Sequence, residues 1–591
     1  MKTKRLLILF AVLININAHG QYIKYTNIDP RYIRNGSKLP SECYVDQPYV
    51  IVCDDGSWLC TMTTSPGTER ARMNHIVATK SYDQGKTWTN LENIESQGGP
   101  QSSWAVPLKV PNGRIYVFYN YNKNRLKGAE AVFSGPFMFK YSDDNGKTWS
   151  EKRYEVPWRI TQIDRDNNSN GKYQFFWSID KPVITDNAAY IAFSKIFINF
   201  NRTEGFILKS KNILTEKNPE KIKWQMLPKG DTGICDSKFG KVQAEHNMVI
   251  LNNENLYVVN RTTTGSPTYA ISSDGGNTFT KPQFMRYANG ERMGTPRACP
   301  KIHKTKDGKY LFWFHNNFRK QTHNGRNPVW LSGGIEKNGT IVWSQPEIVL
   351  YDKDPELLGM SYPDYIEQGG RMWLIETQKH IARIHKVDLD LLQEMWKQGK
   401  DAEVIQNGLI MDVDEEMMNS NNINFPSLPS LINGGGFSIG LWLTVNTLKP
   451  DQQILSTFGP RIKGVKISIS KDRAIKILIN DGERRMNKLE EGQIFISDAK
   501  TITKNQLHHI VFIVDGAAKI VSIVVDGILS DGGIDTRPYG WGRIYPYMQN
   551  MNDTYKCFIN PSFDGKVHHI RVYDRYFRTS EAIANYNAGI K

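Results

Sequence analysis

The sequence predicts an all-β protein in which a six-bladed β-propeller precedes a β-sandwich of the jelly-roll type. The stretch SYDQGKTW at 81–88 recurs as SDDNGKTW at 142–149 and as SSDGGNTF at 272–279. Such spacing fits one four-stranded antiparallel sheet per copy, and the intervening strands are rich in β-branched and aromatic residues. From about residue 410, alternating strands with Asp-Gly turns indicate a sandwich.

The number of blades follows from the aromatic residue that closes each copy or degraded copy. Strands after residue 370 supply a sixth blade, and the segment 22–28 could close the ring against them. We therefore expect a propeller at 21–392, a linker at 393–412 and a sandwich at 413–591. The closing aromatics, 61, 75, 55 and 64 residues apart, are Trp88, Trp149, Trp224, Phe279 and Trp343.

The repeated stretch itself is better explained as scaffolding than as a ligand site. An Asp such as Asp83 accepts backbone N–H bonds in a tight turn, and Gly85 permits a positive φ. Trp88 would pack between sheets. A calcium loop needs more oxygen ligands at alternating positions than any copy offers. We therefore search for the active site away from these turns.

The first residues predict an export signal. Three basic residues within the first five precede an apolar run that ends near Ile14, and small residues follow at Ala18 and Gly20. This is the pattern of a secretory signal peptide over residues 1–20. No later stretch is apolar enough over its length to span a bilayer. The mature protein is therefore expected in the periplasm or outside the cell.

Charge and cysteine content limit the partners. The net charge of +15 favours anionic partners such as acidic polysaccharides, whereas the chain lacks the basic, aromatic-interleaved runs of nucleic-acid binders. Six cysteines in 591 residues form no zinc pattern. We expect no cofactor and no catalytic metal, and leave open a structural calcium ion in the C-terminal domain and the oligomeric state. The pairs His508–His509 and His568–His569 lie in strand patterns, which favours packing over metal binding.

The repeat resembles the Asp box of the sialidase (neuraminidase) superfamily, over about residues 25–390. The segment after 410 resembles a laminin-G or concanavalin A-like domain, through phrases such as FSIGLWLTV and GKVHHIRVYDR. The first resemblance implies a glycoside hydrolase whose active site lies at the channel mouth, opposite the boxes. The second implies a fold and no particular function, because such domains have many roles.

Four residues match the family's catalytic and binding positions. In EHNMVILNNENLYVVNR, two strands joined by an Asn-rich turn would bring Glu245 and Arg261 to one end of adjacent strands. The resemblance implies that Glu245 is a base, that Arg261 binds a substrate carboxylate and that Tyr362 is the nucleophile, as in sialidases. The alternatives are that Glu245 and Arg261 form a surface pair and that Tyr362 is a core aromatic. Arg326 would be a second anion-binding arginine, suited by its planar fork.

Glu376 also fits the family, at the position of a residue that orients an arginine. The sequence departs from the family at Asp46, which stands where the family has its first binding arginine. The general acid is also ambiguous. Glu69 is the carboxylate nearest in register, and His75 is the second titratable candidate. Arg70 and Arg72 in the same loop either replace the missing positive charge or are solvated.

We therefore expect an exported exo-glycoside hydrolase that releases a terminal acidic sugar from glycans or acidic polysaccharide without a cofactor. Two alternatives stay open. One is a propeller polysaccharide lyase or uronate-directed glycosidase that uses His75. The other is a glycan-binding protein without catalytic activity.

Overall fold

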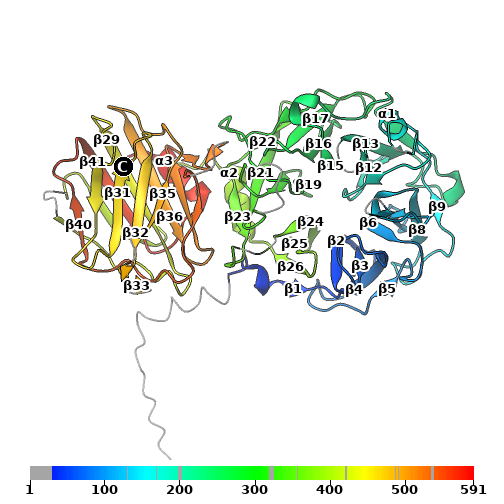
Figure 1. Ribbon diagram of the computed structural model, residues 1–591, viewed down its shortest axis with the longest axis horizontal. Coiled ribbons are helices and arrows are strands. Elements are labelled where there is room, and N and C mark those ends of the chain that lie inside the picture. Colours follow the sequence, from blue (N-terminus) through cyan, green and yellow to red (C-terminus); the bar gives the residue numbers. More distant parts are fainter. Residues whose placement is uncertain are drawn as a thin grey trace, which may run out of the picture.

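The computed structural model shows two β-rich parts side by side, a ring of sheets and a C-terminal two-sheet unit (Figure 1). The predicted signal peptide and the segment 22–28 lie outside the described residues. The structure describes residues 29–590 except 129–130, 168, 198–201, 319–324, 356, 358, 419–421, 486–487, 490–491 and 534–537.

The ring is built from sheets of four or five antiparallel strands, one after another along the chain. The first three sheets consist of β2 (Tyr44–Val52), β3 (Trp58–Ser65), β4 (His75–Ser81) and β5 (Glu92–Asn93); β6 (Ser102–Lys109), β7 (Ile115–Tyr121), β8 (Phe137–Ser142) and β9 (Tyr154–Glu155); and β10 (Phe176–Trp177), β11 (Val183–Ile184), β12 (Ala189–Ile196), β13 (Thr203–Ser210) and β14 (Gln225–Leu227).

The other three sheets complete the ring. They consist of β15 (Ala244–Ile250), β16 (Leu256–Arg261), β17 (Thr268–Ser272) and β18 (Gln283–Phe284); β19 (Lys301–Lys304), β20 (Tyr310–Phe314), β21 (Val329–Lys337), β22 (Thr340–Trp343) and β23 (Glu347–Leu350); and β24 (Ser361–Gln368), β25 (Arg371–Thr377), β26 (Ala382–Lys386) and β1 (Ser37–Lys38). Within the described residues, β1 closes the ring by pairing antiparallel with β26.

Each predicted box occupies the turn between the third and fourth strands of its sheet. In the first copy, the Asp83 carboxylate accepts bonds from the backbone N–H and the hydroxyl of Thr87, at 2.9 and 2.6 Å. The Ser81 hydroxyl accepts the N–H of Gly85 at 2.8 Å, and Gly85 has a φ of 81°. The copies at 142–149 and 272–279 repeat these bonds. The boxes are therefore stapled hairpins that hold the outer strand of each sheet.

The C-terminal unit consists of two antiparallel sheets that share one apolar core. One sheet contains β27 (Leu409–Asp414), β41 (Gly565–Tyr573), β29 (Gly436–Val445), β36 (Leu507–Asp515), β37 (Ile520–Val525), β38 (Ile528–Leu529) and β39 (Gly542–Arg543). The other contains β28 (Asn422–Asn424), β40 (Lys556–Ile559), β30 (Gln453–Ser456), β31 (Gly464–Ile469), β32 (Ile475–Asn480) and β35 (Gln493–Ile496). A separate hairpin is formed by β33 (Arg484–Arg485) and β34 (Lys488–Leu489).

The doubled histidines contact protein side chains. His508 Nδ1 lies 2.7 Å from Asp526, and the ring of His509 packs 4.6 Å from that of Trp442. His568 lies 3.1 Å from Glu415. In the described part of the chain, no cluster of three or more His, Cys, Asp or Glu side chains has the arrangement of a metal site. None of the described helices combines the length and the apolar character that a membrane span requires.

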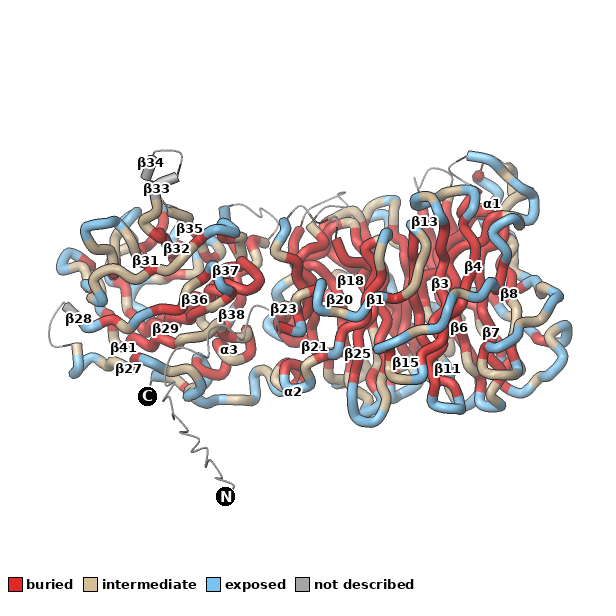
Figure 2. The backbone as a smooth tube through the Cα atoms, turned by 90° about the horizontal axis from the view of Figure 1, so that it is seen from below, coloured by how far each residue is buried: buried red, intermediate tan, exposed pale blue. Residues whose placement is uncertain are grey.

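The ring and the C-terminal unit are firmly joined. One apolar cluster contains both Trp330 of the ring and Phe577 of the C-terminal unit. The Glu347 carboxylate of β23 accepts the N–H groups of Thr579 and Ser580, at 2.9 and 2.7 Å, at the start of α3 (Thr579–Ala588). An anion at a helix N-terminus is favourable because it meets unpaired N–H groups and the positive end of the helix dipole. Figure 2 shows that the strands on both sides of this junction are mostly buried.

Candidate active site

Four inner strands of the ring share a local distortion at the same end. Each of β2, β6, β15 and β24 contains a register shift within its first few residues. The shifts enclose Gln47, Trp104, Glu245 and Tyr362, with φ angles of 48°, 60°, 59° and 48°. A bulge redirects a side chain, and left-handed backbone is rare for residues other than glycine. The distorted strands therefore present side chains that a regular strand would place elsewhere.

Two of these residues meet. The Tyr362 hydroxyl donates a hydrogen bond of 2.8 Å to Glu245 Oε1, and Arg261 Nη1 lies 2.7 Å from the same oxygen. Arg261 ends β16, opposite the start of β15, as the sequence predicts. Tyr362 is 3% exposed. Burial, and then the Glu245 carboxylate, hold the pKa of Tyr362 well above its usual value, so the phenol is neutral until a base takes its proton.

Two further arginines surround this pair. Arg326 donates to the Ser361 hydroxyl at 2.6 Å and to the carbonyl of Arg297 at 2.9 Å. Burial, and then the neighbouring Arg261 guanidinium, lower the pKa of Arg297. Among the described residues, no partner accepts from the buried Nε of Arg261 or of Arg297, and none donates to Glu245 Oε2. So much unbalanced positive charge is the expected environment for an anionic ligand.

Asp46, which stands where the resemblance would place an arginine, has a cation beside it. The buried Asp46 carboxylate accepts bonds from the Tyr44 hydroxyl at 2.7 Å, the Gln47 N–H at 3.0 Å and Lys379 Nζ at 2.8 Å. Lys379 lies in the hairpin between β25 and β26, and its ammonium is 4.4 Å from the centre of the Tyr362 ring. The positive charge that the sequence lacks at position 46 is thus supplied by the hairpin of another sheet.

The structure separates the two candidates for the general acid. Glu69 Oε1 lies 3.4 Å from Lys379 Nζ, next to the Tyr362 site. His75 is buried on β4, where its ring contacts the Met73 carbonyl at 3.0 Å and lies 3.7 Å from Glu42. These contacts tie His75 to its own sheet. Glu69 is therefore the better placed of the two.

The remaining predicted residues lie around the cluster in different ways. The Arg70 guanidinium lies 5.6 Å from the ring of Phe133, and Arg72 is exposed in the same loop. Glu376 faces Arg383 across the β25–β26 pair, and its Oε1 lies 3.6 Å from His385. These contacts place Glu376 within its own sheet. Its expected role in orienting a binding arginine stays a prediction.

An aromatic wall borders Tyr362 on one side. Trp104 stacks on Phe133 at 4.8 Å and lies 5.4 Å from Trp177. Trp177 in turn lies 6.1 Å from the Tyr362 ring and 5.2 Å from the Arg261 guanidinium. Aromatic faces of this kind suit the apolar faces of sugar rings. The site therefore has a cationic side and an aromatic side.

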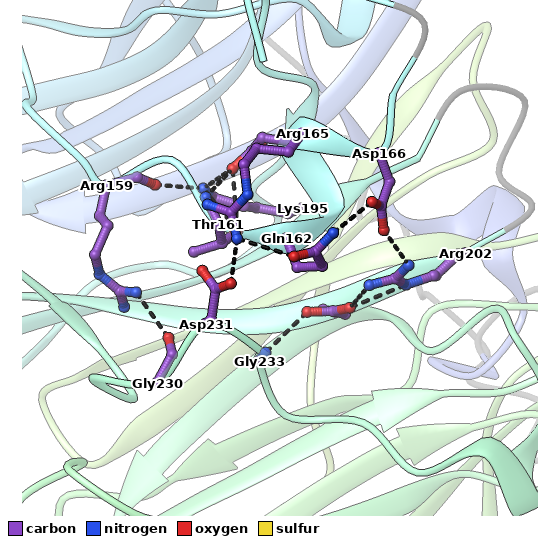
Figure 3. Close-up of polar contacts among 12 residues, drawn as sticks. Arg159, Thr161, Gln162, Arg165, Asp166, Lys195, Arg202, Gly230, Asp231 and Gly233 are labelled. Atoms are coloured by element: carbon purple, nitrogen blue, oxygen red, sulfur yellow. Dashed lines mark hydrogen bonds and ion pairs between the residues drawn. The ribbon is translucent and has the colours of Figure 1, made fainter. Parts of the chain in front are cut away.

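The segment that leads to Trp177 is clamped by buried charge. Lys195 of β12 donates to the Arg159 carbonyl at 2.6 Å and to the carboxylate of Asp164 in the short helix α1 (Gln162–Arg165) at 2.5 Å. Figure 3 shows these contacts beside the ion pair of Arg165 with Asp231. A buried pair of this kind leaves an uncompensated charge when one partner is lost. The clamp therefore holds α1 and the segment before it against β12.

Several of these residues were missed from the sequence: Tyr44, Trp104, Trp177, Arg297 and Lys379. A local signal existed for Trp104, because Ser103–Trp104 and Ser361–Tyr362 both place an aromatic after a serine at the start of an inner strand. Lys379 has no such signal. Its hairpin reaches the site only because the last sheet adjoins the first, where the Lys379 carbonyl accepts the N–H of Val45 at 2.9 Å.

Comparisons with solved structures give matches of low identity. A Trypanosoma rangeli sialidase in complex with sialic acid is 12% identical, with a TM-score of 0.41 and coverage of 93% of this chain and 94% of that one. A protein of unknown function from Dyadobacter fermentans is 17% identical, with a TM-score of 0.45 and coverage of 60% and 97%. The NanB sialidase of Streptococcus pneumoniae is 12% identical, with a TM-score of 0.43 and coverage of 61% and 71%.

Two family models match separate parts of the chain. Residues 102–374 match the BNR repeat-like domain, and residues 418–584 match the concanavalin A-like lectin/glucanases superfamily. No curated protein matches the chain. The chain therefore contains a segment that matches a BNR repeat-like domain and, after it, a C-terminal segment that matches the concanavalin A-like lectin/glucanases superfamily.

Proposed function

We propose that this protein is an exported exo-glycoside hydrolase that releases a terminal acidic sugar from glycans or acidic polysaccharide. The observation that carries the proposal is the 2.8 Å hydrogen bond from the buried Tyr362 hydroxyl to Glu245, among Arg261, Arg297 and Arg326. A phenol beside a carboxylate base is a neutral nucleophile. It approaches an anomeric centre that carries a carboxylate without charge repulsion.

The fold supports this function as a scaffold. We take the six sheets of the ring as the blades of a six-bladed propeller at 21–392, and the two C-terminal sheets as a jelly-roll sandwich at 413–591. The inner strands then converge on the channel mouth at the end that carries Glu245 and Tyr362. The boxes hold the outer strands and take no part in the chemistry.

In the proposed reaction, Glu245 removes the Tyr362 proton while the phenolate oxygen attacks the anomeric carbon. The bond to the leaving oxygen breaks, and Glu69 donates a proton to that oxygen. Water then attacks the anomeric carbon, the bond from that carbon to the Tyr362 oxygen breaks, Glu69 takes the proton of that water, and Glu245 returns its proton to Tyr362. Arg261 and Arg326 hold the substrate anion throughout. No described contact favours a reaction through His75.

The test uses a panel of 4-methylumbelliferyl glycosides of N-acetylneuraminic acid, a 3-deoxy-2-keto sugar acid, glucuronic acid and galacturonic acid. We expect release from at least one of them. The Tyr362→Phe variant should then lose at least about 100-fold in kcat, because the nucleophile is absent. Rapid quenching of the wild-type reaction followed by mass spectrometry should find a glycosyl adduct on Tyr362.

Tyr119→Phe is the matched control, because Tyr119 is a buried tyrosine that also donates to a glutamate, Glu95. It should retain full activity. Full activity of Tyr362→Phe on the identified substrate would exclude the proposed nucleophile. Binding of sugar acids without release of any sugar would instead indicate a glycan-binding protein, and an unsaturated uronide product would indicate a lyase.

A further inference from the structure

Lys379 lies at the centre of a charged group that the proposed reaction does not yet use. Its ammonium lies 2.8 Å from Asp46, 3.4 Å from Glu69 and 4.4 Å from the centre of the Tyr362 ring. The ammonium therefore contacts the face of the proposed nucleophile and two carboxylates at once. Its side chain is 26% exposed, so an incoming ligand can reach it.

The two carboxylates differ in how firmly they are held. Asp46 is fully buried and accepts three hydrogen bonds, so it is a fixed anchor. The Glu69 side chain is 49% exposed and has the longer contact with Lys379. An exposed ion pair contributes little stability and exchanges readily with competing ions. Glu69 is therefore the partner that a ligand can displace.

Glu69 also occupies the place of an anion. The positive charges that act on it come from three elements: Lys379 from its hairpin, Arg70 from its own loop and Arg326 from the loop before β21. The negative or ionisable groups that face it, Asp46 and Tyr44, come from β2. Lys379, the strongest influence, lowers the pKa of Glu69, which keeps the free carboxylate ionised and unable to donate a proton.

We propose that the carboxylate of an acidic sugar displaces Glu69 from Lys379, so that Lys379 binds the substrate and Glu69 becomes the proton donor. This inference rests on the proposed function and names the substrate class as sugars with a free carboxylate. Loss of the ammonium and approach of a second carboxylate both favour the protonated form of Glu69, which takes its proton from solvent. Glu69 is thus protonated, and able to act as the acid, only when substrate is present.

Proton uptake on binding tests this step without turnover. Tyr362→Phe protein is titrated near pH 6 with the free acids of the four panel sugars, by calorimetry in two buffers that differ in ionisation enthalpy. The sugar acid that binds should take up close to one proton per site. The additional change Glu69→Gln should abolish the uptake and leave binding. Binding without proton uptake before that change would overturn the proposal.

Steady-state kinetics of variants that keep Tyr362 test separately the role of Glu69 as proton donor and the role of Lys379 in binding the substrate. Glu69→Gln should lower kcat/KM about 100-fold or more for an alkyl glycoside of the identified sugar, and far less for the aryl glycoside, whose leaving group needs no proton. Lys379→Met should raise KM for the sugar acid about tenfold or more and leave KM for its methyl ester unchanged. An equal rise for acid and ester would contradict a direct contact with the carboxylate.

The controls separate this inference from folding defects and from the proposed function. Lys140→Met removes a largely buried lysine that pairs with Glu95 outside the site, and should change neither constant. If Lys379→Met fails to fold because Asp46 is left unpaired, the double variant with Asp46→Asn removes both charges. A panel of glycosides without turnover rejects the proposed function, whereas turnover of the panel together with binding to Tyr362→Phe that takes up no proton rejects only this inference.

Discussion

At the scale of single residues, this protein buries charge and balances it with few partners. Asp180, in the segment after β10, is fully buried and lies 3.1 Å from Lys301. Burial raises the pKa of Asp180 to about 6 even with that lysine nearby. Asp531 of the C-terminal unit is a stronger case. Burial, and then the neighbouring Asp498, raise the pKa of Asp531 to about 7.

The Asp531→Asn variant should therefore change the pH dependence of stability. Because the folded-state pKa lies above the ordinary 3.8, the stabilising effect of the proton is complete below about pH 4 and is lost as pH rises to about 7. At pH 8 the variant should melt above wild type, because it avoids an ionised, partly buried carboxylate next to Asp498. Melting curves from pH 5 to 8 check this.

The exposed Asp186 serves as the control, since Asp186→Asn should leave the pH dependence of melting as it is in wild type. A wild-type protein whose stability rises from pH 5 to 8 in parallel with that of Asp531→Asn would contradict the assignment.

At the scale of elements, the boxes fasten neighbouring sheets of the ring together. The second box carries Gly146, whose φ is 80° and whose position for a Cβ lies 2.7 Å from the Leu59 side chain of the preceding sheet. The first carries Gly85, whose Cβ would lie 2.9 Å from Ile384 of the last sheet. Each box therefore needs glycine for two reasons, the left-handed backbone and the close approach.

Gly146→Ala is expected to destabilise the ring by about 2 kcal/mol or more, because strain and overpacking add. Gly290→Ala is the matched control. It has a φ of 89° and nothing within 4 Å of the added Cβ, so it carries the backbone strain alone. Denaturant midpoints of the two variants give the difference. Equal losses would show that contact with the neighbouring sheet contributes nothing.

At the scale of the whole molecule, the C-terminal unit contacts the described residues that flank 319–324, close to Arg326 in the chain. Trp541 Nε1 donates to the Asn316 carbonyl at 2.7 Å, shortly before that segment. Shortly after it, Asn327 donates to the Asp352 carbonyl at 3.0 Å, and Arg543 donates to the same carbonyl at 3.0 Å. Asn316 and Asn327 are therefore tied, directly or through Asp352, to the segment around β39.

Trp541→Phe should raise KM for the sugar acid several-fold with little change in kcat, because it loses the hydrogen bond that positions Arg326 indirectly. Trp442→Phe is the control, since this buried tryptophan lies within the C-terminal unit and its Nε1 has no partner among the described residues. Steady-state kinetics and melting temperatures are measured together. A lower melting temperature with an unchanged KM would mean that the contact only joins the two parts.

The candidate site was partly predictable because some of its residues belong to local patterns. Glu245 and Arg261 share one hairpin, so strand pairing alone brings them to the same end. Tyr362 lies 117 residues from Glu245, and only the resemblance connected the two. The contact between Lys379 and Asp46 spans 333 residues and depends on which sheet meets the first one.

By itself, the sequence determined the all-β class, the repeated turns and the change of pattern near residue 410, because periodicity and turn chemistry are local properties. Only the tertiary structure decided which charges share the site. It showed that β1 at 37–38 closes the ring among the described residues, and that Lys379 reaches Asp46 and Glu69. The physical reason is that these contacts depend on the closure of the ring, which aligns side chains that no local pattern relates.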